Sequence, residues 1–187
     1  MIITQKIDKA VAILHEGGVL AYPTEAIFGL GCDPSNQVAI QHLLALKKRS
    51  SDKGLILMAA NMQQLEPYIL PLANDLKQKI LATWPGFITW IVPARTHIST
   101  SLTGKRRTLA VRVSDYSLCR QLCQKFGSAI VSTSANLSGL TPAITTDEVI
   151  QQFPQNLNAI LDHPVQGRHC PSEIRDAKTG DILRSGC

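Results

Sequence analysis

The fold is decided around residues 21–31, which read Ala21-Tyr22-Pro23-Thr24-Glu25-Ala26-Ile27-Phe28-Gly29-Leu30-Gly31. This stretch begins in a short apolar run at 19–22, which predicts a buried strand. Turn residues at 33–36 then lead into residues 38–46, whose apolar spacing predicts an amphipathic helix. A strand, a polar loop and a helix in succession indicate an α/β protein.

The same alternation continues along most of the chain. Predicted strands cover 19–22, 55–59, 87–92, 109–113, 129–132, 159–161 and 182–184. Predicted helices cover 7–14, 38–46, 62–66, 72–84, 116–126 and 147–153, and residues 93–107 are expected to form an exposed loop. We therefore expect an α/β sheet with helices packed against it, as one domain over residues 1–187.

Composition limits the classes of function. The chain has 187 residues, of which 44% are hydrophobic and 18% charged, and its net charge is +5, which favours an anionic partner such as a nucleotide, a nucleic acid or a membrane surface. No apolar run approaches the roughly 20 residues needed to span a bilayer, and the N-terminus lacks a signal-peptide core. The sequence predicts a cytoplasmic protein without a membrane partner.

The cysteines and histidines give little sign of a metal site. Five cysteines form an odd set without CxxC spacing, so neither a disulfide framework nor a zinc site is indicated. His163, His169 and Cys170 could form a metal site, but surface or capping roles are the default interpretation. We predict no metal held by the protein alone.

A second polar loop, Ser132–Gly139, follows the apolar run 129–131. Open α/β sheets bind ligands at the carboxyl ends of their strands, so this loop and the loop at 21–31 together suggest one small-molecule site. The alternative is structural, because Ser, Thr and Asn also cap helices and close turns. The same two interpretations apply to Thr24 and Glu25, which follow Pro23.

The basic cluster Lys47-Lys48-Arg49 follows the helix predicted at 38–46. Cations there complement the helix macrodipole, but with Lys53 they would also suit a polyphosphate. An extended backbone would point Lys47 and Arg49 the same way, whereas continued helix would splay them by about 200°. The chain lacks GxxxxGK[ST] and a complete dinucleotide fingerprint, so ATP would bind by another route.

Two further basic features allow a choice of interpretations. Arg112 lies inside a predicted strand on the same face as Ala110, so it is either at an exposed edge or paired with an anion such as a carboxylate ligand. Residues 105–107, Lys-Arg-Arg, form a solvated loop or gather phosphates or RNA.

The ordered motifs of the whole chain resemble the YrdC/TsaC family of threonylcarbamoyl-AMP synthases. They are Tyr22-Pro23-Thr24-Glu25, Phe28-Gly29-Leu30-Gly31, Lys47-x-Arg49, Lys53-Gly54-Leu55-Ile56-Leu57, Trp84-Pro85-Gly86, Leu109-Ala110-Val111-Arg112-Val113, Ser134-Ala135-Asn136-Leu137-Ser138-Gly139 and Pro171-Ser172-Glu173-Ile174-Arg175-Asp176. The resemblance implies a single YrdC-like domain with a twisted, open, mixed sheet and flanking helices. Where longer relatives often have a His near the amino-acid pocket, this chain has Met58.

The resemblance also implies an activity. The family joins L-threonine, bicarbonate and ATP with Mg²⁺ into threonylcarbamoyl-adenylate and releases pyrophosphate. A downstream threonylcarbamoyl-transferase complex then modifies adenosine 37 of tRNAs that read codons beginning with A. The implied catalytic residues are Lys47 and Arg49. The implied ATP-binding residues are Lys47, Arg49, Lys53, Thr108, Ser134, Asn136 and Arg184. The implied threonine-binding residues are Thr24, Arg112, Ser132 and Ser172.

A competing hypothesis is a non-catalytic RNA-binding module that uses the basic residues. It predicts tight RNA binding that weakens steeply with salt and needs no nucleotide. Hydroxyl-rich loops favour a small-molecule pocket over an RNA platform, so the sequence favours the enzyme.

Overall fold

The structure is a computed structural model that describes residues 1–186. Its strands are β1 (Ile2–Thr4), β2 (Leu20–Pro23), β3 (Phe28–Gly31), β4 (Ile56–Ala59), β5 (Ile88–Pro93), β6 (Thr108–Val113), β7 (Ile130–Ser134), β8 (Ala159–Leu161), β9 (Glu173–Asp176) and β10 (Ile182–Arg184). Its helices are α1 (Ile7–His15), α2 (Gln37–Leu46), α3 (Asn74–Leu81), α4 (Thr100–Thr103), α5 (Ser117–Phe126) and α6 (Thr146–Gln152), with a short 3₁₀ helix, η1 (Ser51–Lys53).

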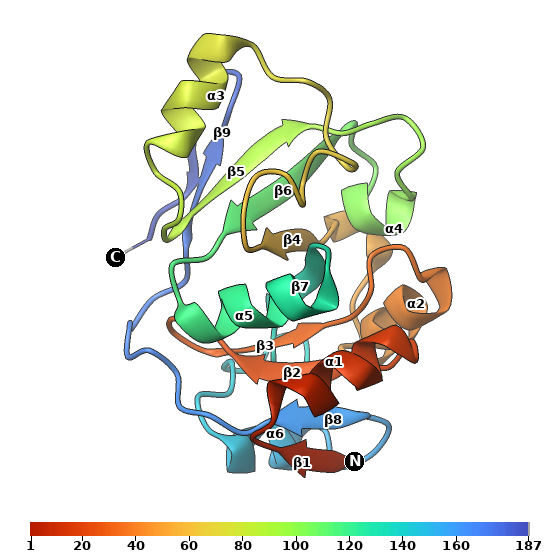
Figure 1. Ribbon diagram of the computed structural model, residues 1–187. Helices are drawn as coiled ribbons and strands as arrows, with labels where there is room; N and C mark the ends of the chain where they lie inside the picture. Colours follow the sequence, from red (N-terminus) through yellow and green to blue (C-terminus); the bar gives the residue numbers. More distant parts are fainter. Residues whose placement is uncertain (187) are drawn as a thin grey trace.

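Within residues 1–186 the strands form one ten-stranded sheet in the order β1-β8-β2-β3-β7-β4-β6-β5-β9-β10. The pairs β1/β8, β8/β2, β4/β6 and β5/β9 run parallel, and the other neighbouring pairs run antiparallel. The strand direction turns steadily from β2 to β9, which is the twist expected of an open sheet (Figure 1). The expected mixed α/β sheet with flanking helices is confirmed.

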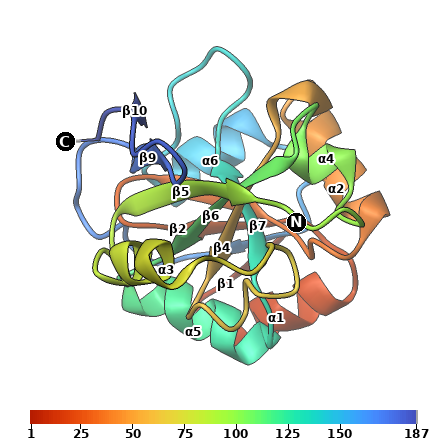
Figure 2. The ribbon, with the colours of Figure 1, turned by 90° about the horizontal axis from the view of Figure 1, so that it is seen from above.

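Helices cover both faces of this sheet. Side chains of β2 alternate between the faces: Leu20 and Tyr22 pack in the cluster that includes α1 and α5, and Ala21 packs in the cluster that includes α2. The view along the sheet shows α1 and α5 on one side and α2 and α6 on the other (Figure 2). In the described part of the chain no helix combines the length and apolar character required to traverse a bilayer.

Local signals fix where the helices begin and end. The Asn36 side chain accepts a hydrogen bond from the Ala39 amide and starts α2. Gly127, at a φ of +82°, ends α5 in the left-handed conformation that glycine adopts without strain. Thr145 and Glu148 form a capping box that starts α6. Because α2 ends at Leu46, the basic cluster that follows it lies beside the chain that enters β4.

Several predicted elements need correction. The strands β1, β3 and β9 and the helix α4 were not predicted, and α3 is shorter than the helix expected at 72–84. The helix expected at 62–66 is absent from the described chain, where successive turns replace it. The Gln64 and Asn61 side chains accept the Ala60 and Gln64 amides, and such side-chain bonds compete with helix formation.

Candidate active site

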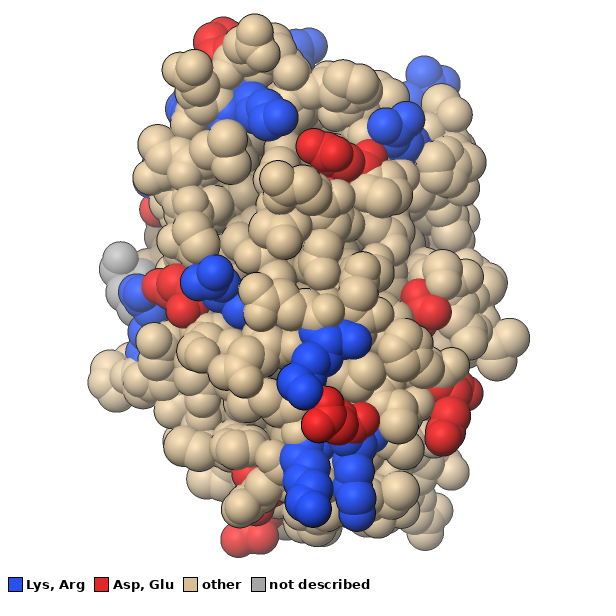
Figure 3. Space-filling view, viewed as in Figure 1, with Lys and Arg blue, Asp and Glu red and all other residues tan. Residues whose placement is uncertain are grey.

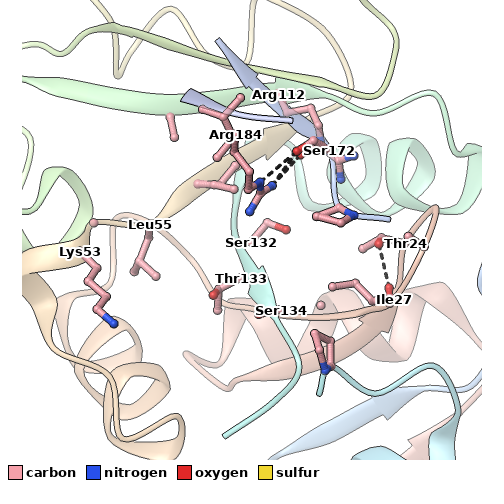
Figure 4. A pocket seen from close by; sticks show the side chains of 18 of the residues that line it. Thr24, Ile27, Lys53, Leu55, Arg112, Ser132, Thr133, Ser134, Ser172 and Arg184 are labelled. Carbon is pink, nitrogen blue, oxygen red and sulfur yellow. Dashed lines mark hydrogen bonds between the residues drawn. The ribbon is translucent and has the colours of Figure 1, made fainter. Parts of the chain in front are cut away.

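A cavity of about 680 Å³ opens over the sheet, and its walls come from segments far apart in the sequence (Figure 4). They are the turn after β2, the chain between α2 and β4, parts of β6 and β7, and the chain from residue 169 to β10. Nine of the eleven predicted site residues line it: Thr24, Arg49, Lys53, Thr108, Arg112, Ser132, Ser134, Ser172 and Arg184. Lys47 and Asn136 lie behind its wall.

Arg112 is held by a carboxylate of the protein itself. Its Nη1 donates to Glu25 Oε2 at 2.9 Å, and Glu25 Oε1 accepts from Ser114 Oγ at 2.7 Å. Glu25 is 0% exposed and Arg112 is 6% exposed. Because β6 lies between β4 and β5, the exposed-edge interpretation of Arg112 is wrong. As the alternation predicted, Ala110 and Arg112 both line the cavity.

Hydroxyl groups surround this arginine. Thr24 Oγ1 donates to the Ile27 carbonyl at 2.7 Å, and Ser132 Oγ accepts from the buried Tyr22 hydroxyl at 2.8 Å. Burial raises the pKa of Tyr22 well above its usual value, so this hydroxyl stays a donor. Fixed hydroxyls at these positions can receive an amino acid's polar groups.

Arg184 lies at the same end of the cavity. Its Nε and Nη2 donate to the Ser172 carbonyl at 3.1 and 2.8 Å, and its guanidinium lies well away from Lys53 (Figure 4). Burial and the nearby charge of Arg112 lower the pKa of Arg184. The structure therefore places Arg184 with the residues that the resemblance assigned to threonine.

Other cations gather toward the chain between α2 and β4. Arg49 Nη2 donates to the Gly54 carbonyl at 3.0 Å, while its buried Nε has no hydrogen-bond partner among residues 1–186. Burial lowers the pKa of Arg49. Lys53 and Arg106 also line the cavity here, although Arg106 belongs to a loop that the sequence left open between solvent and phosphate contact. This end can hold an anionic group with several oxygens.

The basic cluster is neither extended nor a continued helix. Lys47 closes α2 in the helical region, and Lys48 has a φ of +49°. The turn buries Lys47, exposes Lys48 and brings Arg49 to the cavity. Lys47 Nζ donates to the Ser134 carbonyl and to two oxygens of Asn136.

The loop after β7 closes turns rather than capping a helix directly. The Asn136 side-chain amide donates to the carbonyls of Leu137 and Leu140 at 3.0 and 2.7 Å. Asn136 therefore has the structural role of closing a turn, whereas Ser132 and Ser134 line the cavity.

The sequence left Glu25 between ligand contact and turn closure and did not predict its buried ion pair, because its partners Arg112 and Ser114 lie 87 and 89 residues away. Met58 is buried and its Sδ lies 3.8 Å from Arg112 Nη2, so it packs beneath the arginine.

Cys170, on the cavity wall, is disulfide-bonded, which corrects the expectation drawn from cysteine spacing.

The described cavity wall carries no Asp or Glu side chain. Nor do residues 1–186 contain a group of three or more His, Cys, Asp or Glu that could hold a metal ion.

Comparisons with known proteins identify the family of the chain. The Sua5_yciO_yrdC family, described as "Telomere recombination", matches residues 12–186. Threonylcarbamoyl-AMP synthase of Photobacterium profundum is 52% identical over 182 residues, covering 96% of this chain and 98% of the relative. The enzyme of that name from Photorhabdus laumondii is 54% identical over 181 residues, covering 96% and 95%.

Solved structures share the fold. Sua5 of P. abyssi, complexed with L-threonine, has a TM-score of 0.91 at 25% identity; the match covers 99% of this chain but 57% of that one. E. coli YciO has a TM-score of 0.84 at 23% identity, covering 99% and 93%. The chain belongs to the Sua5/YciO/YrdC family.

Proposed function

We propose that the chain is an enzyme that makes threonylcarbamoyl-AMP from L-threonine, bicarbonate and ATP, as a nucleotidyltransferase that releases pyrophosphate. The product serves the modification of adenosine 37 in tRNAs that read ANN codons, through a downstream threonylcarbamoyl-transferase complex in the cytoplasm. One cavity carries the proposal. It has an arginine paired with a carboxylate at one end, and at the other end cations that form no ion pair within residues 1–186. The chain is also about half identical to synthases over nearly its full length.

The amino acid would bind at the Arg112 end. The guanidinium faces the threonine carboxylate, and the hydroxyls of Thr24, Ser132 and Ser172 contact the remaining polar groups. A P. abyssi relative has been solved with L-threonine, which supports this class of substrate. Glu25 keeps the guanidinium in place, so little ordering remains to be done when threonine binds.

ATP would bind toward Arg49 and Lys53. These cations face the phosphates, while Thr108 and Ser134 contact the nucleotide. Mg²⁺ arrives with ATP, because the described cavity wall offers it no carboxylate. Arg184, beside Ser172, lies at the amino-acid end and would face the point where the nucleotide meets threonine.

The reaction needs positioning and charge stabilisation rather than a protein nucleophile. The threonine amine adds to carbon dioxide derived from bicarbonate and loses a proton, giving a carbamate. A carbamate oxygen then attacks the α-phosphorus, and the bond from that phosphorus to the pyrophosphate oxygen breaks. Arg49 and Lys53 stabilise the charge that develops on pyrophosphate.

The test is pyrophosphate release by the purified protein, with threonylcarbamoyl-AMP identified by mass spectrometry. Release should require threonine, bicarbonate and Mg²⁺ together. Arg49→Met should reduce turnover strongly, while Lys48→Met, its exposed neighbour, serves as the matched control. Absence of product with all substrates present would refute the proposal.

The RNA-binding alternative has less support. On the face seen in Figure 3, Lys and Arg are interspersed with Asp and Glu and do not form one continuous basic patch. The cavity cations instead come from separate segments and line one cavity. Filter binding across a salt series distinguishes the two functions, because RNA binding through phosphates weakens steeply as salt rises.

A further inference from the structure

Lys47 uses its hydrogen-bonding capacity within the protein. Its ammonium donates to the Ser134 carbonyl, to the Asn136 carbonyl at 2.8 Å and to Asn136 Oδ1 at 3.2 Å. A lysine ammonium has three N–H donors, so these three acceptors satisfy it. The residue is 2% exposed and lies behind the wall of the cavity.

The loop that Lys47 holds also binds back to the turn that carries Lys47. The Ser138 amide donates to the Lys47 carbonyl at 3.1 Å, and Ser138 Oγ donates to the carbonyls of Lys47 and Lys48 at 2.9 and 3.2 Å. The turn at 47–48 and the loop at 134–138, about ninety residues apart, thus each donate hydrogen bonds to the other. Ser134, at the start of this loop, lines the cavity.

Arg49 differs from Lys47 in what remains available for a ligand. The positive φ of Lys48 turns the chain so that Arg49 reaches the cavity wall. Its Nε is buried and unpartnered within residues 1–186, and only its Nη2 contact with the Gly54 carbonyl holds the guanidinium. A buried donor without a partner is costly, and Arg49 lines the cavity, where a ligand acceptor can approach its guanidinium.

From these contacts we infer that Lys47 is a positioning residue, which holds the loop 134–138 in the shape of the nucleotide site, whereas Arg49 contacts the phosphates. The inference rests on the proposed function only in naming the nucleotide. It divides a pair of cations that the resemblance treats alike. Loss of Lys47 should loosen the loop and weaken binding of any part of the nucleotide, and loss of Arg49 should weaken phosphate binding alone.

Hydrogen exchange without substrate tests whether Lys47 holds the loop 134–138. We expect the amides of residues 134–138 to exchange about tenfold faster or more in Lys47→Met, a loss of about 1.4 kcal/mol in protection. Arg49→Met and Lys48→Met should leave their exchange near that of the wild-type protein. Unchanged exchange in Lys47→Met would overturn the inference, whether or not the protein is a synthase.

Binding of ATP and of adenosine tests whether Lys47 and Arg49 act on different parts of the nucleotide. In Lys47→Met the dissociation constants of both ligands should rise by a similar factor, because the loop and not the phosphates is affected. In Arg49→Met the dissociation constant of ATP should rise about tenfold more than that of adenosine. Weakening of ATP alone in Lys47→Met would make Lys47 a phosphate ligand and overturn the inference.

A second variant covers the case in which Lys47→Met does not fold. Ser138→Ala removes the two return contacts of the Ser138 hydroxyl and leaves the backbone contact and the Lys47 ammonium in place, and Ser138 does not line the cavity. It should speed exchange of residues 134–138 and weaken ATP and adenosine alike. If Ser138→Ala leaves exchange and both affinities unchanged, the two-way connection does not shape the site and the inference fails.

Discussion

Glu25 gives the sharpest test of the electrostatics behind the cavity. Its carboxylate is fully buried and is shared between Arg112 Nη1 at 2.9 Å and Ser114 Oγ at 2.7 Å. Glu25→Gln keeps the size of the side chain but removes its charge, so Arg112 becomes a buried cation without a carboxylate partner. Breaking one side of a buried ion pair costs about 3–5 kcal/mol. We expect the midpoint of thermal unfolding to fall by about 6 to 20 °C.

Urea unfolding of three variants measures this effect. The matched control is Asp8→Asn, which breaks the exposed pair with Lys125 and should change the free energy of unfolding by less than about 1 kcal/mol. The double variant Glu25→Gln/Arg112→Met should be more stable than Glu25→Gln alone, because it removes the unpaired charge. A Glu25→Gln protein within about 1 kcal/mol of wild type, or additive effects in the double variant, would refute the reasoning.

Further predictions concern caps, turns and titration. Thr145→Ala removes the capping box of α6 and should lower the free energy of unfolding by about 1 kcal/mol, measured in urea. Gly104→Ala should cost more than about 1 kcal/mol, because Gly104 has a φ of +68° and an added Cβ would lie 2.4 Å from the Asp52 carbonyl oxygen. Burial raises the pKa of Cys32 and Cys123 to about 12, so both should resist iodoacetamide at pH 8 until the chain is unfolded. Burial lowers the pKa of Lys47 from 10.5 to about 8, so between these two pH values the unfolded chain binds more protons than the folded one. The free energy of unfolding of the wild type, relative to that of Lys47→Met, should therefore increase as the pH rises. Urea unfolding at pH 7.5 and 9.5 would measure the increase.

Local periodicity predicted the parts of the fold that carry strong local patterns. The strand Leu20–Pro23 follows from the apolar run at 19–22, and the shared face of Ala110 and Arg112 follows from the alternation of side chains along a strand. The strand Phe28–Gly31 does not, because two of its four residues are glycines, which have low strand propensity. It forms because β2 and β7 pair on either side of it, and a Cβ at Gly31 would lie 2.6 Å from the Val131 carbonyl oxygen. Close strand approach selects glycine there, a tertiary cause that propensity does not reveal.

In the candidate site, too, local patterns predicted some features and tertiary structure decided the others. Residue type and position indicated Arg49, Ser132 and Ser134, because Arg49 follows α2 and the two serines lie in the carboxyl-terminal half of β7. The separation of Arg49 from the buried Lys47 depends on the left-handed turn at Lys48, which no pattern in the basic cluster distinguishes from helix or extended chain. The role of each cation is therefore decided by a backbone turn rather than by residue type.

The charges around the cavity are asymmetric, and this asymmetry orients the proposed substrates. At the Arg112 end the carboxylate of Glu25 neutralises one cation, so Arg184 supplies the remaining positive charge and one substrate carboxylate balances it. At the other end Arg49, Lys53 and Arg106 line the cavity, and within residues 1–186 none of them forms an ion pair with a carboxylate. The carboxylate of an amino acid suits the first end, where it meets one uncompensated cation, and a polyphosphate suits the second end, where several cations match its several negative charges. The reverse arrangement would place the phosphates beside Glu25 and leave three cations facing an amino acid, so the buried carboxylate sets which substrate binds at which end.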